Sequence, residues 1–150
     1  MIRRTAFTMI ELVFVIVILG ILSAVAIPRL SATRDDAITS SLAQNIMSGA
    51  TEIAAYATAK GTILSDLTQM SNGVKALVDF SGANSSANQV IVPYGAITDC
   101  ITVNIVTSGG TDTLTITQGS AGTDSKCLKL QQLIDTSIYP MILRGAYVAQ

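Results

Sequence analysis

The chain has 150 residues, of which 49% are hydrophobic and 13% are charged, and its formal net charge is −1. This composition excludes an intrinsically disordered chain, and the near-neutral charge gives no electrostatic basis for a nucleic-acid partner. Because the chain has no histidine and only two cysteines, we expect no enzyme activity, no catalytic residue, no metal and no cofactor.

The first predicted element is a long apolar helix that follows a short basic segment. Arg3 and Arg4 precede it, and residues 12–27 carry no charge. This run is slightly short for a membrane span, whereas residues 7–27 are long enough. The longer span includes Glu11, an acidic residue whose place among apolar neighbours needs a reason.

An ordinary secretory signal and a plain membrane anchor are two interpretations of this segment. In the first, Ala24-Val25-Ala26 forms a small-x-small cleavage motif, and the mature chain begins at Ile27. In the second, the helix stays in the membrane, with basic residues on both sides that leave its orientation open.

The order of residues at the start of the helix indicates a third interpretation. A basic leader ends at Ala6 and is followed by Phe7-Thr8-Met9-Ile10-Glu11 and then by LVFVIVILGILSAVAIP. This order resembles type IV prepilins and type II secretion pseudopilins over about the first 35 residues. The pattern is specific, because a charge inside an apolar span is rarely accidental. Ala6 departs from it, since the family usually has glycine before the cleaved bond.

The resemblance implies a path of processing and assembly. A prepilin peptidase would remove the leader, residues 1–6, by cutting between Ala6 and Phe7, and would then methylate the new amine of Phe7. Residues 7–28 would remain in the bilayer of the bacterial inner membrane. The assembly machinery of that membrane would then move the subunit into a helical homo-oligomer, a periplasmic or extracellular filament. Family filaments often unwind the helix between a glycine and a proline, here Gly20 and Pro28.

Glu11 has a local interpretation and an assembly interpretation. Thr8 and Glu11 fit a capping box, in which each side chain bonds the backbone amide of the other. Glutamine would cap as well and would cost less to bury, so capping alone does not explain the acid. In the assembly interpretation, Glu11 pairs with the Phe7 amine of a neighbouring subunit and sets the register between subunits.

The helix is expected to continue past Pro28 to Lys60. Over residues 29–60 it becomes amphipathic, which predicts that this half packs on a sheet. Lys60-Gly61 is typical of a helix C-terminus. The predicted apolar stripe consists of Ile38, Leu42, Ile46, Ala50, Ile53 and Ala57.

The pattern of residues 61–150 predicts a globular β-rich domain. Together with the long N-terminal helix, this predicts an α+β fold in which the helix packs on a small antiparallel sheet. The resemblance to pilins implies the same fold. We expect three or four strands. The expected elements are a short strand or helix near 74–80, a loop at 81–88, strands at 90–92, 100–106 and 113–117, and a strand or covering loop at 139–147.

Two pairs of side chains in this domain suggest specific sites. Cys100 and Cys127 predict a disulfide if the domain is exported, with two buried thiols as the alternative. The resemblance favours the bridge, because many pilins have one near the C-terminus and many pseudopilins do not. Asp112 and Asp124 lie near the predicted hairpin, where we expect solvated turn residues rather than a calcium site.

These features predict the structural subunit of a type IV pilus or pilus-like filament. The alternative within the same class is a type II secretion pseudopilin. The alternative from another class is a secreted or membrane-anchored binding domain behind an ordinary signal.

Overall fold

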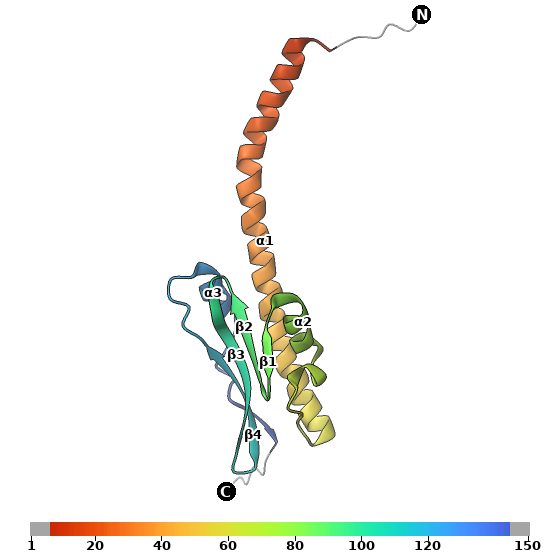
Figure 1. Cartoon of the computed structure of the whole chain (residues 1–150), viewed down its shortest axis with the longest axis vertical. Coiled ribbons are helices and arrows are strands. Elements are labelled where there is room, and N and C mark those ends of the chain that lie inside the picture. Colours follow the sequence, from red (N-terminus) through yellow and green to blue (C-terminus); the bar gives the residue numbers. More distant parts are fainter. Residues whose placement is uncertain (1–6, 145–150) are drawn as a thin grey trace, which may run out of the picture. The chain divides into compact units, whose positions relative to one another are not determined.

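The structure is a computed structural model that describes residues 7–144, so the leader and the predicted cleavage residue Ala6 lie outside the described residues. It has the expected α+β architecture, a long helix packed on a small antiparallel sheet (Figure 1). The chain divides into two compact units, residues 1–37 and 38–150. In chain order the elements are α1 (Met9–Lys60), the 3-10 turn η1 (Leu67–Gln69), α2 (Asn72–Ser81), β1 (Asn84–Ser86), β2 (Gln89–Tyr94), β3 (Ile97–Ser108), β4 (Thr111–Gln118), α3 (Ser125–Leu133) and β5 (Met141–Arg144).

The described part of the first unit, residues 7–37, contains the apolar first half of α1. Every residue from Phe7 to Arg34 is exposed, and the helix continues without interruption through Gly20 and Pro28. It is long and apolar enough to cross a membrane, and by length and composition alone it fits either a membrane anchor or a signal sequence. A contiguous exposed apolar surface of more than a few hundred Å² is typical of a site that contacts lipid or another protein.

The second unit is built on a five-stranded antiparallel sheet in the order β1-β2-β3-β4-β5. The inward faces of the two longest strands agree with the predicted alternation: Ile101, Val103 and Ile105 are buried on β3, as are Leu114 and Ile116 on β4. Gly109 and Gly110 form the turn between them. Both have positive φ, 58° and 80°, as a two-residue hairpin turn requires.

The second half of α1 lies against this sheet through its buried stripe. The predicted stripe is confirmed from Leu42 to Ala57, but Ile38 is 41% exposed. Thr39 is buried instead, and its hydroxyl lies 2.7 Å from the Tyr94 hydroxyl on β2. The predicted helix end is also confirmed: Gly61 follows Lys60 with φ 64°.

Helix α2 is held against α1 by a close contact between two glycines. A Cβ atom on Gly73 would lie 2.8 Å from the Asn45 carbonyl oxygen and 2.9 Å from the Gly49 nitrogen. Glu52 of α1 accepts hydrogen bonds from the Ser71 hydroxyl at 2.8 Å and from the Gly73 amide at 3.1 Å. These bonds, the amide first, lower the pKa of Glu52 below its ordinary value.

The sheet has five strands where three or four were expected, and the structure corrects or completes the expectations for this domain at several further points. Residues 74–80 are helical, and residues 125–133 form α3, a helix that was not predicted from the residue pattern. Strand β2 runs through Pro93 rather than ending there, because the pairing shifts register between Val92 and Tyr94 and a bulge tolerates proline. The loop predicted at 81–88 contains β1. Of the tail predicted at 139–147, residues 141–144 form β5, and Tyr147 lies outside the described residues.

Candidate functional site

The first turn of α1 contains the predicted capping box. The Thr8 amide and hydroxyl donate to Glu11 Oε2 at 2.9 and 2.7 Å, and the Glu11 amide donates to Thr8 Oγ1 at 3.3 Å. Both groups that donate to the carboxylate are neutral. The local interpretation of Glu11 is therefore confirmed, and these two neutral donors leave the formal charge of the carboxylate in place.

Apolar side chains surround this carboxylate. Glu11 lines a shallow hollow of about 400 Å³ whose other residues are Phe7, Ile10, Phe14 and Val15. All four of these side chains are exposed. When lipid or another helix covers this surface, the carboxylate loses water and a nearby cation becomes strongly favourable.

Gly20 and Pro28 are two weak points in the apolar half of α1. A Cβ atom on Gly20 would meet nothing within 4 Å, so packing within the subunit does not require glycine there. Pro28 lies inside the helix and lacks the amide that would complete the hydrogen-bond ladder. Unwinding of the helix between them stays a prediction for the assembled state.

The expected disulfide joins the sheet to α3. Cys100 of β3 and Cys127 of α3 are bonded, with Cα atoms 5.7 Å apart. Gln131 adds a second connection, because its side-chain amide donates to the backbone carbonyls of Cys100 at 3.0 Å and Gly119 at 2.8 Å. The bridge is thus part of the fold of the C-terminal region.

Asp124 is not the solvated turn residue that we expected, because it caps α3. Its Oδ1 accepts hydrogen bonds from the Lys126 and Cys127 amides at 3.0 and 2.8 Å, and its Oδ2 accepts one from the Ala96 amide at 2.9 Å. These bonds, the one from the Cys127 amide first, lower the pKa of Asp124. The carboxylate therefore fastens α3 to the turn between β2 and β3.

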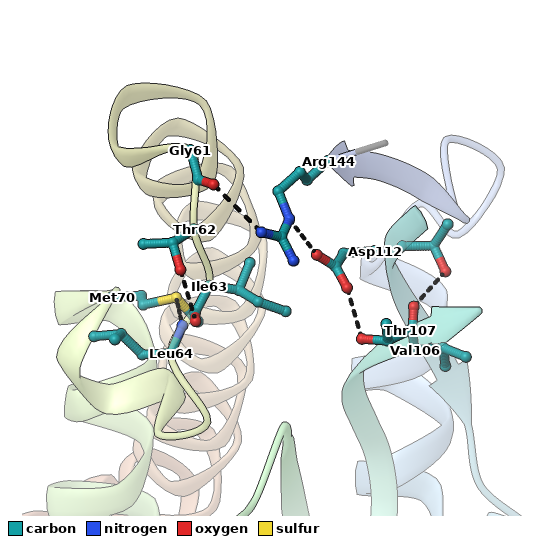
Figure 2. Close-up of polar contacts among 10 residues, drawn as sticks. Gly61, Thr62, Ile63, Leu64, Met70, Val106, Thr107, Asp112 and Arg144 are labelled. Carbon is teal, nitrogen blue, oxygen red and sulfur yellow. Dashed lines mark hydrogen bonds and ion pairs between the residues drawn. The ribbon is translucent and has the colours of Figure 1, made fainter. Parts of the chain in front are cut away.

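Asp112 also departs from the expected solvated turn, because its side chain is 0% exposed. It accepts a hydrogen bond from the Thr107 hydroxyl at 2.6 Å and forms an ion pair with Arg144 Nε at 2.8 Å (Figure 2). Arg144 also donates to the Gly61 carbonyl at 3.5 Å. The Thr107 bond and then Arg144 lower the pKa of Asp112. The alternation along β4 could have predicted this burial. Asp112 is two residues before Leu114 and four before Ile116, so the three side chains share one face of the strand.

Both aspartates thus have structural roles. Within residues 7–144, no group of three or more His, Cys, Asp or Glu side chains is placed to hold a metal ion.

Comparisons with protein-family models, curated proteins and solved structures found no match.

Proposed function

We propose that the chain is the structural subunit of a filament of the type IV pilus class. The observation that carries the proposal is an exposed apolar helix with a carboxylate in its first turn, continuous with a helix half that belongs to a folded domain. In this proposal the helix is held in the inner membrane before assembly and packs against helices of other copies afterwards.

The cost of burying Glu11 supports this proposal over a plain anchor. An acid at the centre of a bilayer costs about 2.5–3.5 kcal/mol on insertion scales and less near the interface. Removal of residues 1–6 would place a positive amine on Phe7. In an apolar filament core, that amine and the Glu11 carboxylate of a neighbour compensate each other, whereas a wrong axial offset leaves both unpaired.

The two alternatives explain fewer of these observations. An ordinary signal or anchor requires only an apolar stretch and gives Glu11 no role beyond the capping box with Thr8. A type II secretion pseudopilin would share the N-terminal features, but the Cys100–Cys127 disulfide favours the pilus, because the resemblance associates such a bridge with pilins.

A pair of substitutions separates capping from charge. Glu11→Gln keeps an oxygen that can accept the Thr8 bonds and removes the charge, whereas Thr8→Ala removes the capping hydroxyl and keeps the charge. We expect Glu11→Gln to abolish filaments, measured by shearing and electron microscopy, at normal subunit level and leader cleavage. Thr8→Ala should assemble close to the parent. Normal assembly of Glu11→Gln would refute the charge-pair account.

A further inference from the structure

Two hollows lie beside α1 in the folded domain. The α2 hollow, about 310 Å³, is bounded by α1, α2 and the end of β2, and α1 contributes Ile38, Ser41, Leu42 and Asn45. The α3 hollow, about 180 Å³, is lined by Ser40, Ala43, Gln44 and Met47 of α1 and by Leu133 of α3. At 3.6 residues per turn, the two sets of α1 side chains point roughly 160° apart. The hollows therefore lie on opposite flanks of the helix.

Phe80 lies at the α2 hollow as an exposed aromatic side chain. It is 89% exposed, more than any other large hydrophobic side chain described in residues 38–144. Helix α2 is fixed at both ends, by the Ser71 cap and by Gly82 with φ 72°. Because Phe80 is presented on a fixed helix, burying its ring gains much apolar area at a small entropic cost.

The α3 hollow has the chemistry and size to receive such a ring. None of its lining residues is charged, and Leu133 is 53% exposed. The Met47 thioether is a favourable neighbour for an aromatic ring. The hollow of about 180 Å³ is also large enough, since a cavity of roughly 150 Å³ accepts benzene.

We propose that Phe80 of one copy docks in the α3 hollow of the next copy. The inference rests on the proposed filament function and names the contact between folded domains. Identical copies related by a screw operation must touch through two different surfaces, and such a heterologous contact propagates when it does not close into a ring. Phe80 lies exposed at one flank of α1 and the α3 hollow lies at the other flank. Each copy therefore carries the two different surfaces that such a contact requires.

Cross-linking within filaments tests the contact. Both native cysteines are in the disulfide, so Ala76→Cys together with Gln44→Cys introduces one free thiol at each hollow while Phe80 stays in place. A short bis-maleimide should convert filaments of this double variant into a ladder of covalent multimers under denaturing conditions. Ala76→Cys with Val106→Cys is the control, because Val106 is 41% exposed on β3 and lines neither hollow, and it should give no ladder.

Substitution of Phe80 provides a second readout. Phe80→Ser should lower filament yield several-fold at a normal subunit level, and Phe80→Leu should stay near the parent. If filaments form but the double variant gives no ladder, or Phe80→Ser assembles like the parent, the docking proposal is wrong and the filament function stands. If the parent forms no filaments, both proposals fail.

Discussion

Gly73 shows how strongly a single position constrains this fold. A side chain there would press on the backbone of α1 at Asn45 and Gly49, and neither can move without disturbing the helix. We expect Gly73→Ala to lower the free energy of unfolding by about 1–3 kcal/mol, as overpacking does. Urea denaturation of the detergent-solubilised chain measures this, and an unchanged midpoint would contradict the close contact.

Asp112 makes stability depend on pH. Its pKa is lowered in the folded chain by Thr107 and then Arg144, so the unfolded state binds more protons as pH falls through the ordinary range of an aspartate. The stabilisation is fully present above about pH 4, the ordinary aspartate value, and is lost progressively as pH falls from there through the lower pKa of the folded state. We expect the urea midpoint of Asp112→Asn to lie below that of the parent at pH 7 and the difference to shrink at pH 3. A difference that stays the same at both pH values would show that folding does not lower the pKa of Asp112.

Residue patterns allowed only part of the site to be predicted. The Thr8–Glu11 box and the Cys100–Cys127 bridge follow from short-range spacing and cysteine chemistry, and the structure contains both. Arg144 pairs with Asp112 across 32 residues, a distance over which no local pattern acts. The exposure of Phe80 likewise depends on where α2 packs, which periodicity does not encode.

At the scale of elements, periodicity predicted the parts with long regular patterns. The stripe of α1 and the alternating faces of β3 and β4 are in this class. Helix α3 was missed because its N-terminal signal is one capping aspartate and its apolar face is short. Strands β1 and β5, with three and four residues, are too short to show alternation, and they are fixed by pairing with β2 and β4.

Helix α1 should behave differently in the subunit and in the filament. Gly20→Ala should leave the isolated subunit equally or slightly more stable, by up to about 1 kcal/mol. In the filament we predict an extended segment between Gly20 and Pro28, so the same substitution should reduce filament yield. An electron cryomicroscopy map with unbroken helix from Gly20 through Pro28 would rule this out.

The disulfide should stabilise the C-terminal part of the domain without being needed to form it. Replacing both Cys100 and Cys127 with serine should lower the free energy of unfolding by roughly 3–4 kcal/mol on the loop-entropy model. Because Gln131 and Asp124 still hold α3, the far-ultraviolet circular dichroism spectrum should remain native. Loss of a native bridge usually costs more than about 1 kcal/mol. A smaller destabilisation would show that the bridge hardly restricts the unfolded chain.

At the scale of the whole molecule, the two halves of α1 differ in how much of their surface is buried. Residues 7–34 are all exposed and mostly apolar, while the second half of α1 buries its stripe in the folded domain. In the proposed function, the first half forms the filament core and the domain forms its outer layer. The apolar segment must therefore remain in the mature chain.

The mass of the mature N-terminal peptide tests this account most directly. Protein purified from its membrane or from filaments should begin at Phe7, with one methyl group on the Phe7 amine, as read by tandem mass spectrometry. A chain that begins at Ile27 would have lost the filament core to an ordinary signal peptidase. A chain that still begins at Met1 would be a plain anchor with no free amine at Phe7, and either result would contradict the account.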